Sequence, residues 1–261
     1  MQPSELVPLK GLQEEKYGLV LCYPKYDLKE LRRRLKELKR LGVEAVEFAG
    51  EKMVFDVPVL GKGCVGIVVV AHTDVGKVAL KVRRVDADRA GMQREAEMLR
   101  RANAIDVGPR LLDVTENFLL MEFVEGTLLP QWVEALKGRG ARSRIRRVLR
   151  AVLKQCYMLD EAGLDHGELS RAPKHIIVDV HDRPHLVDFE TASVNRRVSN
   201  VTSVCQYLFI GSHVAKTIKR KLGGVDKNAL INALRNYKQD RGQESFERIL
   251  GVCGVDKEFQ F

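Results

Sequence analysis

Three closely spaced glycines constrain this chain most. Gly61, Gly63 and Gly66 stand at the spacing G-x-G-x-x-G, and Val68 follows two residues later. Two phosphate-binding designs use this spacing. In one, the third glycine opens a helix; in the other, the glycines lie in the turn between two antiparallel strands. Residues 67–70 form an Ile-Val-Val-Val run without helical period, which favours the strand–turn–strand design. Such a turn brings its backbone N–H groups close to phosphate oxygens.

Further motifs follow the glycines in chain order. A strand ends in Val-Ala-Leu-Lys at residues 78–81, and a helical pattern covers residues 93–99. A strand pair leads to Leu-Leu-Met-Glu-Phe-Val-Glu-Gly at residues 119–126. The sequence His-Gly-Glu-Leu-Ser stands at residues 166–170, and a strand enters Asp-Phe-Glu at residues 188–190. Each motif alone has an ordinary explanation, such as a solvated lysine or an edge strand, but their fixed order is far more specific.

Over roughly residues 52–210, these motifs resemble the protein-kinase-like fold. The form His-Gly-x-Leu-Ser and the lack of Ala-Pro-Glu are similar to the atypical RIO family and the KEOPS-complex kinase, and to compact archaeal Ser/Thr protein kinase-like proteins. The resemblance implies an α+β fold of two lobes, with an antiparallel N-lobe sheet, one main N-lobe helix and a mostly helical C-lobe. We expect an N-terminal strand–helix–strand extension over residues 1–51, the N-lobe over 52–125 and the C-lobe over 126–261.

The activity implied by the resemblance is that of a protein kinase, which transfers the γ-phosphate of ATP to a Ser or Thr hydroxyl with Mg²⁺ as cofactor. Lys81, oriented by Glu95 rather than Glu97, would neutralise the α- and β-phosphates. Asp188 would carry Mg²⁺, and Glu168 would orient or deprotonate the acceptor hydroxyl. The glycine turn would hold the phosphates, and the remaining residues would surround the adenine. The expected nucleotide contacts are Gly61, Lys62, Gly63, Gly66, Val68, Ala79, Lys81, Glu95, Met121, Glu122 and Val124.

Three departures from the kinase pattern keep other functions open. Glu168 stands where the catalytic Asp is expected, and His175 stands where an Asn metal ligand is expected, two residues late. His175 is the candidate second metal ligand, although Mg²⁺ prefers oxygen. Glu190 replaces the Gly of Asp-Phe-Gly, and the segment 191–200 is short. The alternatives are a nucleotide-binding pseudokinase or ATPase module, and a small-molecule phosphotransferase similar to choline and aminoglycoside kinases.

The N-terminal extension adds a basic helix. We expect strands at 17–22 and 43–48 around a helix that starts at Asp27, with Glu30 as its capping partner. The helix presents a charged face, which favours either solvation or a contact with RNA, a ribonucleoprotein or an acidic protein. This face consists of Lys29, Arg32, Arg33, Arg34, Lys36, Lys39 and Arg40. The formal charge of +9 agrees with an anionic partner, and the lack of an apolar run near 20 residues predicts a cytoplasmic protein without membrane contact.

Overall fold

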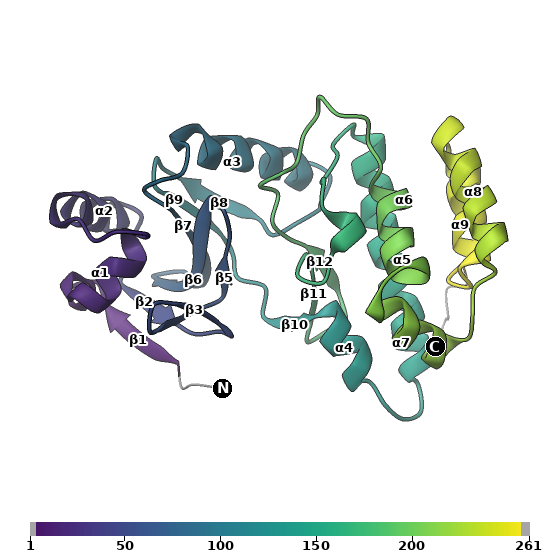
Figure 1. Ribbon diagram of the computed structural model, residues 1–261, viewed down its shortest axis with the longest axis horizontal. Helices are drawn as coiled ribbons and strands as arrows, with labels where there is room; N and C mark the ends of the chain where they lie inside the picture. The colour runs from purple at the N-terminus through teal and green to yellow at the C-terminus, as the bar shows by residue number, and fades with distance from the viewer. Residues whose placement is uncertain (1–3, 257–261) are drawn as a thin grey trace. The chain divides into compact units, whose positions relative to one another are not determined.

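The computed structural model describes residues 4–256 and divides into two compact units. Unit 1 contains Met1–Arg100 and Pro109–Phe123, and unit 2 contains Arg101–Gly108 and Val124–Phe261. The sheet is antiparallel and lies in the N-terminal part, and the C-terminal part is mainly helical, so the expected α+β class is confirmed (Figure 1). The further division of unit 1 at residue 51 stays a prediction.

Unit 1 is built on one antiparallel sheet. Within the described residues its seven strands run in the order β1-β2-β6-β7-β9-β8, with β5 beside β6, while β3 and β4 form a separate two-stranded ribbon. Five strands, β3 to β7, follow one another between Lys52 and Arg83. The elements are β1 (Glu5–Pro8), η1 (Gly11–Gln13), α1 (Glu15–Leu21), α2 (Leu28–Arg40), β2 (Ala45–Phe48), β3 (Lys52–Val54), β4 (Val57–Val59), β5 (Gly61–Lys62), β6 (Gly66–Thr73), β7 (Gly76–Arg83), α3 (Arg89–Asn103), β8 (Leu111–Val114) and β9 (Phe118–Glu122).

The two faces of this sheet have different surroundings. Residues that lie directly opposite each other on antiparallel strands point to the same face. Lys81 is opposite both Val68 and Leu119, so these three side chains share the face on which α3 packs. Leu80 and Val69 point the other way, into the core that α1 and α2 close. Alternation along β7 therefore puts the lysine and the main core on opposite faces.

The expected strand at residues 17–22 is wrong, because residues Glu15–Leu21 form helix α1. The reason is tertiary packing. An added Cβ on Gly18 would lie 2.7 Å from Tyr26 and 2.9 Å from Leu31 of α2, so the glycine allows close approach of the two helices. Helical spacing buries Tyr17, Val20 and Leu21 against the core, which outweighs the weak strand preference of this short stretch.

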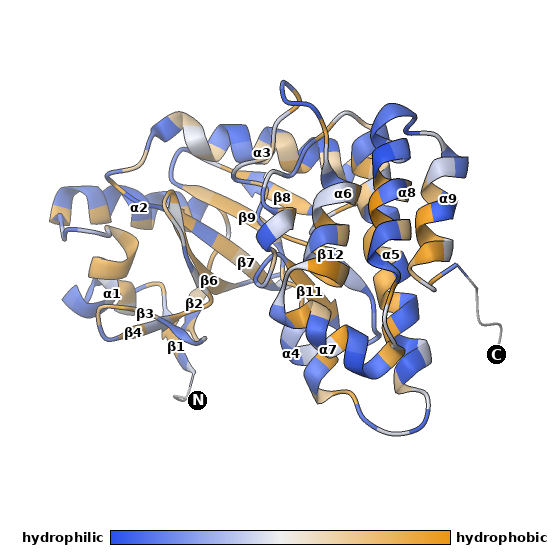
Figure 2. Cartoon of the chain, turned by 45° about the vertical axis from the view of Figure 1, so that its right-hand side comes forward, coloured by the Kyte–Doolittle hydropathy of each residue, from blue (hydrophilic) through white to orange (hydrophobic). Residues whose placement is uncertain are grey.

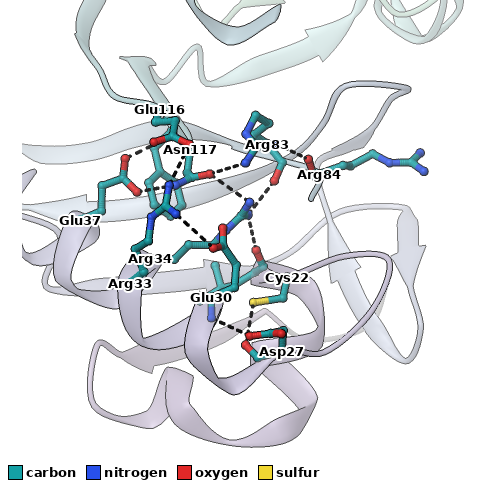
Figure 3. Close-up of polar contacts among 12 residues, drawn as sticks. Cys22, Asp27, Glu30, Arg33, Arg34, Glu37, Arg83, Arg84, Glu116 and Asn117 are labelled. Carbon is teal, nitrogen blue, oxygen red and sulfur yellow. Dashed lines mark hydrogen bonds and ion pairs between the residues drawn. The ribbon is translucent and has the colours of Figure 1, made fainter. Parts of the chain in front are cut away.

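Helix α2 begins as expected but buries one of its arginines. The Asp27 side chain accepts a hydrogen bond from the Glu30 N–H at 2.7 Å, which confirms the predicted cap. Arg34, expected on the solvated face, is fully buried. Its guanidinium donates to the carbonyl oxygens of Leu21 and Arg83 and to the Glu30 carboxylate (Figure 3). The prediction that Arg34 is solvated was wrong, because a guanidinium can take the place of an apolar side chain in a core when its N–H groups are hydrogen-bonded.

The Arg34 contacts extend to the turn between β8 and β9. The Asn117 Oδ1 accepts from Arg34 at 3.1 Å and from Arg83 at 2.7 Å, while its Nδ2 donates to Glu37 at 2.8 Å (Figure 3). Arg83 ends β7, two residues after Lys81. Through these bonds α2 is fastened to the strand that carries the candidate phosphate-binding lysine.

Unit 2 combines a small sheet with amphipathic helices. The short strands β10, β11 and β12 pair antiparallel in that order, and the long helix α5 contacts α6, α9 and β12. Figure 2 shows hydrophobic and hydrophilic residues alternating along these helices, as buried faces require. Among residues 4–256, no helix has both the length and the apolar character needed to cross a membrane. The elements are β10 (Gly126–Leu128), α4 (Leu129–Ala135), α5 (Ala141–Glu161), η2 (Leu169–Arg171), β11 (Ile176–Asp179), β12 (Pro184–Leu186), α6 (Asn200–Cys205), the π-helical η3 (Gln206–Ile210), α7 (His213–Leu222), α8 (Lys227–Gln239) and α9 (Gln243–Val252).

Candidate functional site

The glycine-rich turn lies between β5 and β6, as its flanking residues predict. The Gly63 N–H donates to the Gly66 carbonyl at 2.8 Å, and Gly61 lies opposite Val68. A Cβ on Gly66 would lie only 3.0 Å from Lys81 Cγ and 3.0 Å from the Val82 carbonyl. The third glycine therefore gives the lysine stem room to pass.

Lys81 and Glu95 form the expected ion pair inside unit 1. The Lys81 Nζ lies 2.9 Å from Glu95 Oε1 and 2.7 Å from Oε2, and both residues are almost fully buried. Helix α3 supplies Glu95, with Met92 and Ala96 packing against the sheet. A carboxylate that touches the ammonium with both oxygens holds it in place and offsets part of its desolvation.

The residues expected around adenine are partly on the Lys81 face of the sheet. Ala79 lies opposite Met121, and both share this face with Val68 and Lys81. The Glu122 N–H donates to the Arg110 carbonyl at 2.8 Å, which leaves the Glu122 carbonyl as the backbone group expected to meet adenine. Lys62 lies over the ring of Tyr23, with Nζ 4.6 Å from the ring centroid. Val124 belongs to unit 2.

In unit 2, the loop with His-Gly-Glu is fixed by residues that follow it in sequence. The Asp165 carboxylate accepts from Arg196 Nε at 2.6 Å and from the Ser199 N–H at 2.9 Å. The His166 N–H donates to Asn200 Oδ1 at 2.8 Å, and Asn200 is buried. Sequence reasoning missed Asp165, Arg196 and Asn200 as supports, because each contact joins residues more than 30 positions apart.

A buried histidine brings the two candidate catalytic carboxylates together. His175 is fully buried, with Nε2 2.7 Å from Glu168 Oε2 and Nδ1 3.8 Å from Asp188 Oδ2. The side chains of Glu168 and Asp188 remain 37% and 32% exposed, so each carboxylate reaches solvent. Lys174 Nζ lies 3.7 Å from Asp188. Among the described residues neither ring nitrogen of His175 has a hydrogen-bond partner, so the Nε2–Oε2 contact is close without having hydrogen-bond geometry.

Asp188 has an unusual backbone conformation. Its φ of 71° lies in the left-handed region, which costs energy for residues other than glycine and is often found at functional sites. Phe189 is buried, and its ring centroid lies 5.0 Å from that of His166. Burial, with His175 as a second cause, lowers the pKa of His166 to about 4. His166 is therefore a neutral packing partner that holds Phe189 and, through it, the strained Asp188.

The donor set fits an Mg²⁺ ion that arrives with phosphates. Among the described residues, no group of three or more His, Cys, Asp or Glu side chains is arranged to hold a metal ion. Mg²⁺ is commonly held by one or two carboxylates together with substrate phosphates and water, and the half-exposed Asp188 carboxylate suits that role. Both nitrogens of His175 face carboxylates at 2.7 and 3.8 Å, and its role as a second ligand stays a prediction.

Comparisons with known proteins agree with this geometry. Residues 71–198, about half of the chain, match the family model described as RIO1, RIO domain. The chain is also 28% identical over 121 residues to Uncharacterized protein MJ1211 of Methanocaldococcus jannaschii. The aligned stretch covers 46% of this chain and 99% of that protein. The matched range contains Lys81, Glu95, Glu168 and Asp188. A RIO domain is the domain of atypical kinases and ATPases. The chain is accordingly an atypical kinase-like protein of the RIO family.

Proposed function

We propose that this protein transfers the γ-phosphate of ATP to a Ser or Thr hydroxyl of a protein. The observation that carries the proposal is the buried Lys81–Glu95 pair beneath Gly66. A charge pair that is almost fully buried is costly to form, and buried ionisable groups of this kind cluster at functional sites. If Lys81 neutralises phosphate, the cost of burying the Lys81–Glu95 pair serves nucleotide binding.

In this proposal unit 1 binds the phosphates and the base. The turn from Gly61 to Gly66 offers N–H groups to phosphate oxygens, and Lys62 adds a nearby positive charge. Lys81 neutralises the α- and β-phosphates, while Glu95 fixes the position of its ammonium. The small and apolar residues Val68, Ala79 and Met121 contact adenine from the same face of the sheet. The Glu122 carbonyl of unit 1 pairs with its edge.

Unit 2 supplies the carboxylates of the proposed reaction. Asp188 would hold Mg²⁺, and the bound ion would supply neutralisation of phosphate charge. Glu168 orients the acceptor hydroxyl and accepts its proton. His175 lies between the two carboxylates, with Nε2 2.7 Å from Glu168 Oε2 and Nδ1 3.8 Å from Asp188 Oδ2, and limits how each can move. Phosphoryl transfer depends mainly on positioning and charge neutralisation. Glu168 can therefore replace the Asp of the kinase pattern if the acceptor hydroxyl lies one methylene length further from the backbone of the loop.

A nucleotide-binding module without transferase activity is the second candidate function. The 2.7 Å approach of His175 Nε2 to Glu168 favours this module, because a ring so close to the carboxylate restricts the room for an acceptor hydroxyl. The two candidates share the nucleotide and the metal ion but differ in whether phosphate reaches an acceptor.

Labelled ATP separates these functions. The full chain is incubated with γ-labelled ATP, Mg²⁺ or Mn²⁺ and casein as a generic acceptor. Transfer predicts label on protein that disappears in Asp188→Asn and Glu168→Ala. Asp182→Asn is the matched control, since Asp182 also has a positive φ, of 60°, but pairs with Arg144. Binding of ATP without label on any protein identifies the module instead.

The exposed face of α2 supports a contact with RNA, which we propose as an additional property of unit 1. Five cations of α2 form no ion pair with any residue that the structure describes, and at 3.6 residues per turn they lie within an arc of about 100°. They are Lys29, Arg32, Lys36, Lys39 and Arg40. Binding of single-stranded RNA is expected to weaken as the salt concentration rises. Replacing Arg32, Lys36 and Lys39 by alanine is expected to make the slope of log K against log salt concentration less steep, by about 0.7 per lost phosphate contact. An unchanged salt slope would exclude this surface.

A further inference from the structure

A groove in unit 2 lies outside the proposed reaction site. It has a volume of about 370 Å³ and runs along α6 and η3 on one side and α8 on the other. A volume of this size is within the range of small-molecule sites. None of the described residues that line the groove is an Asp or a Glu.

One end of the groove is cationic and rich in hydroxyl groups. Arg235 and Lys238 line it from α8, opposite Ser199 and Ser203, whose Oγ atoms are 3.3 Å apart. Neither cation forms an ion pair with a carboxylate in the part of the chain that the structure describes. The Ser199 hydroxyl donates to Asp165 Oδ1 at 3.2 Å, so Ser203 can donate to Ser199 or to a ligand. These groups suit a phosphate or carboxylate, which accepts from guanidinium, ammonium and hydroxyl donors.

The other end of the groove is apolar. Ile210 closes η3, and Ile231 and Leu234 face it from α8. Ile231 is 36% exposed although it is a large aliphatic residue. Ile231 and Lys238 are seven residues apart, so the apolar and cationic ends are separated by about 10 Å along the helix. Arg197 donates to the Lys238 carbonyl at 2.9 Å, which places the start of α6 at the cationic end.

From these two ends we infer that the groove binds a small amphiphilic anion, with a phosphate or carboxylate head and a short apolar body. The head meets Arg235, Lys238 and Ser203, and the body covers Ile210 and Ile231. A purely inorganic anion leaves the apolar end exposed, and a neutral molecule leaves two cations without a partner. The length and charge of the groove thus select both halves of the ligand.

Two adjacent residues, Ser199 and Asn200, join the groove to the loop with His-Gly-Glu. Ser199 lines the groove and also holds Asp165 through its backbone N–H at 2.9 Å. Its neighbour Asn200 accepts from the His166 N–H at 2.8 Å and donates to Asp160 at 2.8 Å. A bound anion that orders the start of α6 therefore also protects the backbone of residues 164–168.

Calorimetric titration of the full chain with hexyl phosphate tests this inference. Hexyl phosphate is expected to bind at least about tenfold more tightly than inorganic phosphate or hexanol, since it uses both ends of the groove. The double variant Arg235→Ala/Lys238→Ala is expected to lose at least about tenfold in affinity. The matched control is Lys227→Ala, which removes one charge from the same helix outside the groove and is expected to bind normally.

Several results would overturn the inference. One is equal affinity for hexyl phosphate and inorganic phosphate, and another is that Lys227→Ala loses as much affinity for hexyl phosphate as the double variant. A third is that a hexaglutamate peptide binds more tightly than hexyl phosphate, and a fourth is that the protein forms a concentration-dependent dimer that hexyl phosphate does not dissociate. Slower hydrogen exchange of residues 164–168 with hexyl phosphate is expected in the wild type and not in the double variant. Melting temperatures within about 2 °C establish that the variants are folded. None of these measurements needs phosphoryl transfer, so they remain informative if the proposed function fails.

Discussion

The two units differ in how closely they follow the protein-kinase pattern. In unit 1, Lys81 and Glu95 form a buried pair, and Gly66 makes room for the lysine stem. In unit 2, a Glu occupies the place of the catalytic Asp, and His175 lies between Glu168 and Asp188 where an Asn is expected. The lysine–glutamate pair of the kinase pattern is thus present in unit 1, whereas unit 2 differs from that pattern at two loop positions.

This difference follows from how each half is built. The position of Lys81 is set by the register of β6, β7 and β9 and by the packing of α3, which depend on many residues together. Glu168 and His175 are instead joined by an irregular loop with one short 3₁₀ turn. A loop accepts insertions at little cost, whereas a shift of one residue in a strand reverses every side chain. The position of Lys81 is therefore the more strongly constrained part of the proposed site.

The largest effect is expected from removing the charge of Lys81 in unit 1. Lys81→Met keeps the stem but leaves Glu95 as an unpaired buried carboxylate, and it is expected to lower phosphoryl transfer by about 10³-fold or more. The measurement is the rate of label transfer from γ-labelled ATP at saturating acceptor.

The control for this change is Lys77→Met on the same strand. The Lys77 side chain is half exposed and pairs with Glu47 at 3.0 Å, so its loss is expected to change the rate by less than about twofold. Wild-type activity in Lys81→Met would show that unit 1 does not bind the reacting phosphates.

The buried residue His166 is expected to make unit 2 sensitive to acid. The pKa of His166 is about 4 in the folded protein, below its ordinary value of 6.5. Between pH 6.5 and 4, the unfolded chain takes up a proton at this residue that the folded chain does not. The free energy of unfolding is therefore expected to fall as the pH is lowered through this window, by about 3 kcal/mol in total, and to gain nothing from His166 above pH 6.5.

The difference between the wild type and His166→Gln in urea unfolding at several pH values isolates this contribution. His213→Gln replaces an exposed histidine of unit 2 and is the control for the substitution itself. A pH-independent difference between the wild type and His166→Gln would show that the residue titrates normally in the folded protein.

The role of His175 decides how far unit 2 has departed from the kinase pattern. If His175 positions the carboxylates, His175→Ala is expected to lower kcat by about 30-fold while the KM for ATP and the Mg²⁺ requirement stay close to those of the wild type. If His175 is a metal ligand, the Mg²⁺ concentration for half-maximal activity rises instead, and His175→Asn restores it with an oxygen ligand. Titration of Mg²⁺ against activity in both variants distinguishes the two roles.

The sequence predicted those parts of the site that depend on spacing along one strand or helix. The β-branched residues after Gly66 indicated a hairpin, and the position of Glu95 on its helix indicated the partner of Lys81, which the structure confirms. The order of the motifs was also sufficient for the fold class, because six weak patterns in sequence are specific together.

Long-range contacts could not be predicted in the same way. Helix α1 was mistaken for a strand because the close approach of Gly18 to α2 is a tertiary effect. The burial of Arg34 depends on Asn117, 83 residues away, and no periodicity reveals such a partner. The placement of His175 against Glu168 likewise depends on the path of a loop, which residue spacing does not determine.

The smallest expected effect tests whether the glycine turn serves the lysine. Gly66→Ala adds a methyl group 3.0 Å from Lys81 Cγ and from the Val82 carbonyl, so the lysine stem must move by a few tenths of an ångström. Because the ammonium moves with it, the KM for ATP is expected to rise about fivefold, with kcat nearly unchanged. Gly61→Ala is the matched control, since its methyl group would lie 3.5 Å from Val68, an ordinary contact. An equal rise of KM in both variants would mean that the glycine turn affects ATP binding through its flexibility and not through the room it leaves for Lys81. Unit 1 would then be less preorganised for ATP than the buried Lys81–Glu95 pair indicates.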